Sequence, residues 1–189
     1  GKRLWMKRDD LTGSALTGNK IRKLEFIAAH ALEQGLSTLV TCGGVHSNHC
    51  RATALVAAQL GLDCHLVLRA DDEPEQHTGN FLLDQLAGAS YEIWPAGEWA
   101  GNLKKIYARL ESEFKASGRP ALMIPTGGSD SLGVWGYIAA AEELRWDLEE
   151  SRIERGVLAL ATGSAGTQTG LSAGVAIFDL PLQVIGYAV

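Results

Sequence analysis

Length, composition and charge restrict the class of protein. The chain has 189 residues, of which 46% are hydrophobic and 21% charged, so it is long enough to bury an apolar core. The formal net charge is −5 and the basic residues are scattered, which argues against a nucleic-acid partner. No apolar run approaches the ~18 residues that span a bilayer, and three cysteines are too few for a disulfide framework. We therefore expect a cytoplasmic protein without a membrane partner.

Short apolar runs alternate with helical patterns along the whole chain. The expected helices cover residues 20–32, 48–60, 80–86, 103–114, 133–144 and 167–177. The expected strands are residues 38–42, 64–68, 91–94, 122–124, 157–161 and 182–187. Strands that alternate with helices in this way predict an α/β fold of parallel sheets with right-handed crossovers.

Both ends of the chain have the pattern of an interrupted strand. Residues 4–7 have the pattern of a strand at the start, and the last expected strand reaches nearly to the final residue. These patterns predict that the chain is a fragment of a longer protein. Between the two ends, the acidic residues 71–75 predict a solvated turn, because they have no apolar neighbours to bury.

Residues 17–24 place a lysine in the first turn of a helix, two residues after a glycine that lets the backbone bend tightly. A solvated basic start to an amphipathic helix is one interpretation. The other is a reactive amine, because burial of Lys20 beside Lys23 or Arg22 would favour the free amine that forms a Schiff base. Basic residues at a helix N-terminus oppose the helix dipole, which a site for an anionic ligand would explain.

The segment 42–50 combines two glycines with polar residues at an expected helix start. Free N–H groups and the helix dipole at Ser47, Asn48 and His49 would favour an anion such as a carboxylate. A plain helix cap is the alternative. A metal site is a further alternative that the spacing disfavours, and its candidate ligands are Cys42, His46, His49, Cys50, Cys64 and His65.

Two later turns also carry glycines and hydroxyl residues. The segment 162–167 follows an apolar strand and opens a helix, so it suits a phosphate, although a tight turn without a ligand is the alternative. It matches neither a Walker A loop nor a dinucleotide fingerprint nor a hydrolase elbow. The segment 125–131 either lines the same cleft or is a polar turn.

An amine nucleophile, an anion-binding helix start and a phosphate cradle together suit an enzyme that uses pyridoxal 5'-phosphate. The sequence also resembles the D-cysteine desulfhydrase and 1-aminocyclopropane-1-carboxylate (ACC) deaminase family. This family belongs to the tryptophan synthase β-like, fold type II, pyridoxal phosphate enzymes. The resemblance lies in residues 7–11, 17–25, 43–49, 79–84, 124–129 and 162–167.

The resemblance implies roles for the matching residues. Lys20 would form the Schiff base with the cofactor and move the Cα proton, and Ser47 would be a second catalytic residue. Asn48 would contact the cofactor ring, while Ser47, Asn48 and His49 would bind the substrate. The other implied cofactor ligands are Asn19, Lys23, Thr162, Gly163, Ser164, Ala165, Gly166 and Thr167. No metal is implied.

The resemblance further implies two domains and a homodimer. Residues 1–23 plus 132–189 would belong to the larger, pyridoxal-phosphate-binding domain and residues 24–131 to the smaller one. The implied reaction is α,β-elimination of D-cysteine to pyruvate, sulfide and ammonia, with ACC deamination to 2-oxobutanoate and ammonia as the alternative. D-cysteine is favoured because the deaminases tend to have Gln where this chain has His49, and an imidazole can exchange a proton near neutral pH. A small-molecule or metal-binding α/β module is the non-enzyme alternative.

Overall fold

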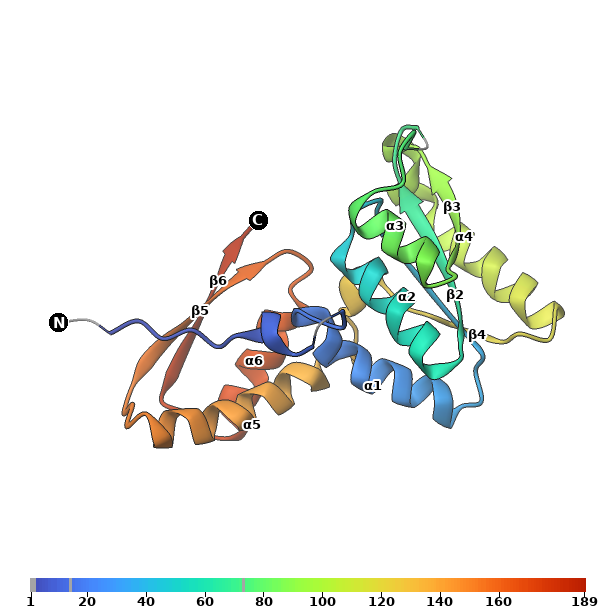
Figure 1. Cartoon of the computed structure of the whole chain (residues 1–189). Coiled ribbons are helices and arrows are strands. Elements are labelled where there is room, and N and C mark those ends of the chain that lie inside the picture. The colour runs from blue at the N-terminus through green and yellow to red at the C-terminus, as the bar shows by residue number, and fades with distance from the viewer. Residues whose placement is uncertain (1–2, 14, 73) are drawn as a thin grey trace.

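Two parallel sheets flanked by helices make up the computed structural model, which describes residues 3–13, 15–72 and 74–189 (Figure 1). The four-stranded sheet has the order β3-β2-β1-β4, and the two-stranded sheet pairs β5 with β6. The strands are β1 (Thr38–Gly44), β2 (Asp63–Arg69), β3 (Ser90–Trp94), β4 (Ala121–Met123), β5 (Gly156–Thr162) and β6 (Leu182–Ala188). The predicted α/β class with parallel strands is confirmed.

Helices alternate with these strands along the chain, as expected for parallel pairing. They are α1 (Asn19–Glu33), α2 (Asn48–Leu60), α3 (Gly79–Leu86), α4 (Ala96–Ala116), α5 (Trp135–Glu150) and α6 (Gly166–Ile177). Two short 3-10 turns, η1 (Asp9–Leu11) and η2 (Thr126–Gly128), lie before α1 and after β4.

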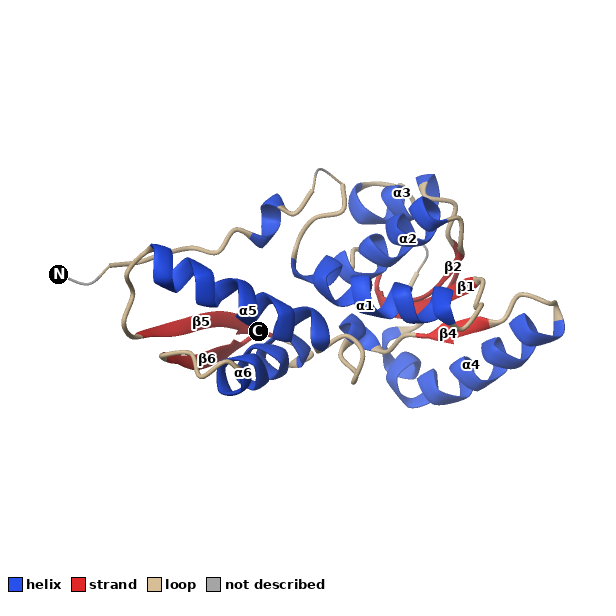
Figure 2. Cartoon of the chain, turned by 90° about the horizontal axis from the view of Figure 1, so that it is seen from below, coloured by secondary structure: helices blue, strands red, loops and turns tan. Residues whose placement is uncertain are grey.

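Helices cover both faces of the four-stranded sheet (Figure 2). Successive residues of a strand point to opposite faces. On β1, Leu39 packs in a cluster with α1 and α2, whereas Val40 and Cys42 pack in a cluster with α4. On β2, Leu66 packs in the cluster with α1 and α2, and Val67 packs in the cluster with α4. All five side chains are fully buried, so this sheet forms the middle layer of a three-layer core.

The two-stranded sheet is covered on one face by α5 and α6. Leu158 and Leu160 of β5 pack with Tyr137 of α5 and Leu171 of α6. Residues of β5 that point the other way are exposed, and Val157 has 58% of its surface accessible. The loop after β5 therefore starts from a strand held by α5 and α6.

Close glycine contacts join α1 to α5 and α5 to α6. A Cβ atom at Gly136 would lie 2.0 Å from the carbonyl oxygen of Arg22, and one at Gly170 would lie 2.5 Å from the Cβ of Tyr137. Real side chains do not tolerate such distances, so only glycine permits these helix backbones to approach so closely. The first turn of α5 is thereby fixed against α1.

Several expected elements differ from the structure. Residues 4–7, expected as a strand, pair with none of the described strands, and Leu4 is 94% exposed. That expectation is wrong because an extended segment becomes a strand only when a neighbour supplies hydrogen bonds. The helix expected from residue 103 begins at Ala96, where Pro95 fits the start of a helix and two glycines had weakened the pattern.

The acidic segment after β2 is exposed but also serves α4. The carboxylate of Asp71 accepts a hydrogen bond from the backbone N–H of Ala96 at 3.0 Å. A negative charge at a helix N-terminus is favourable, so this turn does more than remain solvated. Glu73, a part of the same expected turn, lies outside the described residues.

Replacing Gly136 with Ala should destabilise the protein by about 3 kcal/mol, because the new methyl group would overlap the α1 backbone. The matched control is Gly101→Ala inside α4, where no atom lies within 4 Å of the added Cβ. That change should stabilise the helix by roughly 0.5–1 kcal/mol. Urea unfolding measures both, and a Gly136→Ala protein as stable as Gly101→Ala would contradict the packing described.

Candidate functional site

The turn that leads into α1 is held from several sides. Gly18 has φ +92, a backbone conformation that favours glycine, and its N–H donates to the carbonyl of Asp9 at 3.0 Å. The hydroxyl of Thr17 donates to the carbonyl of Asp10, and the guanidinium of Arg51 on α2 donates to the carbonyl of Thr17 at 3.1 Å. The start of α1 is therefore a fixed platform.

Lys20 lies in the first turn of α1 and is half-buried. Its Nζ donates to the side-chain oxygen of Asn19 at 3.3 Å. Burial lowers the pKa of Lys20 below its usual value, because a charged amine loses hydration there. A lowered pKa leaves more of the amine neutral and nucleophilic at neutral pH. The interpretation of α1 as a helix with a solvated basic start is therefore wrong at Lys20.

Lys23 is buried more deeply than Lys20, with 1% of its surface exposed. It occupies the inner stripe of α1 with Leu24, Ile27 and Ala28. Burial and the charge of Lys20 lower the pKa of Lys23 to about 8. A cation on an apolar stripe needs acceptors from elsewhere in the fold.

Those acceptors come from the turn after β4. Lys23 Nζ donates to the carbonyl of Gly127 at 3.1 Å and to the hydroxyl of Ser129 at 3.0 Å. Ser129 Oγ in turn lies 2.8 Å from Ser164 Oγ in the loop after β5. The segment 125–131 was expected either to line the cleft or to be a polar turn, and these contacts place it at the site.

The loop after β5 reaches the lysines at the start of α6. A Cβ atom at Gly166 would lie 2.4 Å from Ser129 Oγ and 2.7 Å from Lys23 Nζ, so a side chain there would displace both groups. The amide of Asn19 donates to the hydroxyl of Thr167 at 3.3 Å. Ala165 has φ +61, a strained conformation for a residue with a side chain and one that is common at binding sites.

Not every residue of this loop turns toward the lysines. The hydroxyl of Thr162, still part of β5, donates to the side chain of Gln168 at 2.9 Å. Gly163 and Ser164 are exposed. The residues of this loop in contact with α1 are thus Gly166 and Thr167, whereas Ser164 contacts Ser129 in the turn after β4.

The start of α2 contains the second group of predicted residues. Ser47 is the N-cap, and its Oγ accepts from the backbone N–H groups of His49 and Cys50, each at 3.2 Å. The plain cap is therefore present, whatever further role Ser47 has. Asn48 is exposed, and its side-chain oxygen accepts from the amide of Asn80 on α3 at 2.9 Å.

His49 is 3% exposed and lies under the Gly127–Gly128 turn. Its Nε2 is 2.8 Å from the hydroxyl of Thr41, which is 3.1 Å from the carbonyl of Ile124. A carbonyl only accepts, so both contacts are favourable only when Thr41 donates to Ile124 and His49 Nε2–H donates to Thr41. His49 Nδ1 is then an acceptor, and among the described residues it has no partner.

The electrostatics of His49 differ from the expectation. Burial lowers its pKa to about 3, with further lowering by the charges of Lys20 and Lys23. The imidazole is therefore neutral at pH 7, and the expectation that it exchanges a proton near neutral pH is wrong in this structure. A contribution of His49 to substrate binding would be that of a neutral group.

Among the described residues, no cluster of three or more His, Cys, Asp or Glu side chains could hold a metal. The six candidate ligands are spread over β1, α2, β2 and the turn between β1 and α2. Burial also raises the pKa of the Cys50 thiol to about 12, whereas a metal needs the thiolate.

No described helix is long and apolar enough to cross a membrane.

A hollow of about 540 Å³ lies away from these residues, between the N-terminal segment and α5 with β5. Apolar residues such as Trp5 and Leu158 line much of it. Neither lysine of α1 contributes to this hollow, so it is separate from the candidate site.

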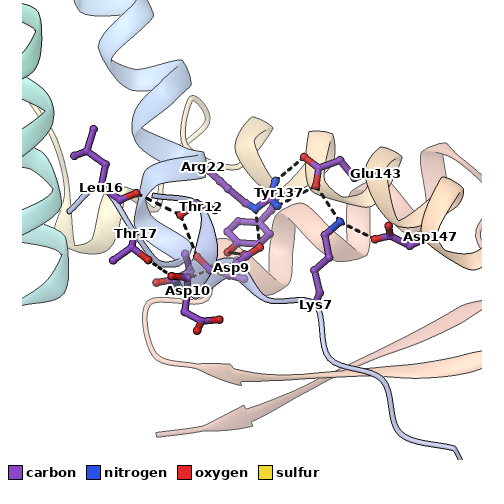
Figure 3. A network of polar contacts seen from close by, with 12 residues as sticks. Lys7, Asp9, Asp10, Thr12, Leu16, Thr17, Arg22, Tyr137, Glu143 and Asp147 are labelled. Atoms are coloured by element: carbon purple, nitrogen blue, oxygen red, sulfur yellow. Dashed lines mark hydrogen bonds and ion pairs between the residues drawn. The ribbon is translucent and has the colours of Figure 1, made fainter. Parts of the chain in front are cut away.

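Two residues that the sequence analysis did not single out also belong to the site. Asp9 accepts a hydrogen bond from Arg22 of α1 and another from Tyr137 of α5 (Figure 3). Asp9 lies within a matched motif, but nothing local indicates a contact with a residue 128 positions away. Tyr137 lacked any signal, because an aromatic residue in a helix is normally core.

Taken together, these groups define a class of site. A half-buried amine with a lowered pKa, Lys20, lies one helical turn from the buried ammonium of Lys23. Lys23 in turn contacts a glycine and hydroxyl cradle at the N-terminus of α6. The amine suits a cofactor carbonyl, and the cradle with Lys23 suits a phosphate. The arrangement therefore fits an enzyme with a phosphorylated cofactor that reacts with a lysine.

Comparison with known proteins identifies the family. The family model described as "Pyridoxal-phosphate dependent enzyme" matches residues 1–188, and the chain belongs to this family. Its cofactor is accordingly pyridoxal 5'-phosphate. The predicted fold type and the resemblance to D-cysteine desulfhydrase and ACC deaminase are confirmed.

The relatives carry both names. The chain is 40% identical to a bifunctional D-cysteine desulfhydrase/ACC deaminase, mitochondrial, of Arabidopsis thaliana, covering 100% of this chain and 49% of the relative. It is 39% identical to a D-cysteine desulfhydrase of Serratia proteamaculans, covering 58% of that protein. A crystal structure of an ACC deaminase homologue superposes with a TM-score of 0.83 at 38% identity, over 96% of this chain and 54% of the other. The chain thus spans about half the length of the curated relatives it matches.

The affinity of the apoprotein for sulfate should fall as the pH rises through about 8. A bound anion favours charged Lys23, whose pKa in the free site is about 8. Binding therefore takes up a proton above that pH, and the affinity falls by up to about tenfold per pH unit. Sulfate keeps the same charge from pH 7 to 9.5. Any change of its affinity over this range therefore reports the protonation of a group on the protein.

Lys23→Met should weaken sulfate binding and flatten its pH dependence. Lys104→Met, on the exposed face of α4, is the matched control and should behave as the wild type. Constant sulfate affinity in the wild type from pH 7 to 9.5 would show that Lys23 does not contact the anion.

Proposed function

We propose that the chain supplies the lysine-bearing part of an enzyme that eliminates a β-substituent from a small amino acid, with D-cysteine as the first candidate. The observation that carries this proposal is the half-buried Lys20 amine, one helical turn before Lys23, whose own amine contacts the cradle formed by Ser129, Ser164 and Gly166. D-cysteine and water would give pyruvate, sulfide and ammonia. One relative is named D-cysteine desulfhydrase and another carries both names, so the relatives agree with either candidate substrate.

Each group near the lysines has a proposed task. Lys20 binds the cofactor, and its Nζ then removes the proton from the substrate Cα. Lys23, Ser164, Gly166 and Thr167 bind the phosphate, with Thr162, Gly163 and Ala165 completing the loop. When bound, pyridoxal phosphate supplies the electron sink for the negative charge that develops at Cα. The amine suits the proton transfer because burial has already lowered its pKa.

The start of α2 has the proposed task of holding the substrate. The Ser47 hydroxyl and the Asn48 amide are hydrogen-bonding groups at a helix N-terminus, where a carboxylate is favoured. Asn19 and Asn48 would orient the cofactor. His49, a neutral imidazole beneath them, would support this loop through Thr41 rather than exchange a proton.

The proposal includes the arrangement of the whole protein. Residues 24–131 would form the smaller domain, and residues 1–23 with 132–189 would belong to the larger one. The two separate sheets and the meeting of their loops at Lys23 support this division. A cytoplasmic homodimer is the form that the family resemblance implies.

Lys20→Ala should abolish both the yellow colour of the purified full-length protein and its turnover, because the neighbouring amine of Lys23 is held by Gly127 and Ser129. Lys104→Ala, on the exposed face of α4, is the control and should retain both. The absorption spectrum and a pyruvate assay measure the two properties. Normal turnover by Lys20→Ala would refute the proposed role.

ACC deamination is the second candidate, because one relative is named for both activities. The two are separated by comparing sulfide and pyruvate release from D-cysteine with 2-oxobutanoate release from ACC by the same full-length preparation. We expect the larger kcat/KM with D-cysteine. A larger kcat/KM with ACC would reverse the order of the candidates without affecting Lys20 or the cofactor.

A further inference from the structure

Asp9 contacts both helices beside the candidate site (Figure 3). Its Oδ1 accepts from Nε of Arg22 at 3.0 Å, and its Oδ2 accepts from the hydroxyl of Tyr137 at 2.7 Å. Arg22 lies on α1 close after Lys20, and Tyr137 lies in the first turn of α5. A single carboxylate therefore links α1 to α5 at the level of Lys20.

The backbone around Asp9 holds the turn on the other side of Lys20. The N–H of Gly18 donates to the carbonyl of Asp9, and the hydroxyl of Thr17 donates to the carbonyl of Asp10. The segment that carries Lys20 is thus held before the lysine by backbone groups of η1 and after it by the carboxylate of Asp9.

Tyr137 extends the contact to α6. It is 4% exposed, and burial and the hydrogen bond to Asp9 raise its pKa, so it keeps its proton and remains a donor. Thr167, in the first turn of α6, interacts with the side chain of Tyr137 and accepts a hydrogen bond from Asn19. A continuous set of contacts therefore runs from Asp9 through α5 and α6 back to the neighbour of Lys20.

The charge of Arg22 is compensated on its other side. Its two terminal nitrogens donate to the carboxylate of Glu143 at 2.8 and 2.9 Å. The hydrogen bond to Glu143 and the charges of Asp9 and Glu143 raise the pKa of Arg22. Arg22 is therefore a permanent cation paired with two carboxylates, and it acts on Lys20 through the position of α1.

We propose that Asp9 is a positioning residue of the reaction, which sets the orientation of α1 through Arg22 and the place of the α6 start through Tyr137. The inference rests on the proposed function, because it concerns the site that would hold pyridoxal phosphate. A small displacement of reacting groups is costly to the rate. Loss of the Asp9 charge should therefore reduce cofactor affinity and kcat, while KM for the substrate stays nearly constant.

The test compares Asp9→Asn with Asp10→Asn in the full-length protein. Asp10 is the matched control, because its exposed carboxylate pairs with Arg8 rather than with α1 or α5. Three quantities are measured: the Kd for pyridoxal phosphate from quenching of tryptophan fluorescence, kcat and KM at saturating cofactor, and the Tm of the apoprotein.

In Asp9→Asn the Kd for pyridoxal phosphate should rise and kcat should fall, each by about tenfold, as expected for loss of a charged hydrogen-bond acceptor. KM should remain within about twofold of the wild type, and Asp10→Asn should match the wild type throughout. Tyr137→Phe is the second variant, since it removes one hydrogen bond of Asp9 and keeps the charge. Its effect should be smaller and should add little to that of Asp9→Asn, because both changes act on one contact.

Two outcomes would overturn this inference and leave the proposed function intact. One is a lower apoprotein Tm in Asp9→Asn and Tyr137→Phe with wild-type Kd and kcat, which would show a purely structural role. The other is an equal effect of Asp10→Asn. If the wild type binds no pyridoxal phosphate, the proposed function fails and this inference fails with it.

Discussion

The burial of the Lys23 ammonium is the constraint on which the candidate site depends. A cation on the inner stripe of a helix is costly unless acceptors surround it. α1 cannot supply them, because its own carbonyls are used within the helix, so they come from Gly127 and Ser129. Ser129 also contacts Ser164, and the loop that follows β5 is thereby linked to the turn that follows β4. Loops from two separate sheets meet at one amine.

The same burial creates a local positive charge in a chain whose net charge is −5. Lys20 and Lys23 are one helical turn apart, and each loses hydration, which lowers both pKa values. Asp130 is the carboxylate that acts in the opposite direction on Lys23. A phosphate group would offset the repulsion between the two amines more fully than one carboxylate can. The phosphate would pair with Lys23, whose amine already contacts Ser129 and lies close to Gly166.

The features that the sequence predicted correctly are local ones. The apolar run of β1 and the polar start of α2 depend on neighbouring residues in the chain, and a strand over residues 38–42 and a helix from residue 48 were both expected there. The features that were missed depend on contacts between distant segments. Residues 4–7 could become a strand only with a partner, and the bond from Tyr137 to Asp9 joins residues 128 positions apart. The sequence pattern does not predict the burial of Lys23, because a lysine in a helix is normally exposed to solvent.

His49 shows why residue type alone is a weak guide to substrate choice in this site. Its imidazole is neutral, donates through Nε2 to Thr41 and presents Nδ1 as an acceptor. A glutamine side chain is also neutral and also offers one donor group and one acceptor, so the two residues do not differ in charge here. Discrimination between D-cysteine and ACC through position 49 would therefore arise from the shape and rigidity of the loop that it supports. The imidazole is planar and contacts Thr41, which is itself fixed by its hydrogen bond to the Ile124 carbonyl. A glutamine would have to order more rotatable bonds to make the same contact.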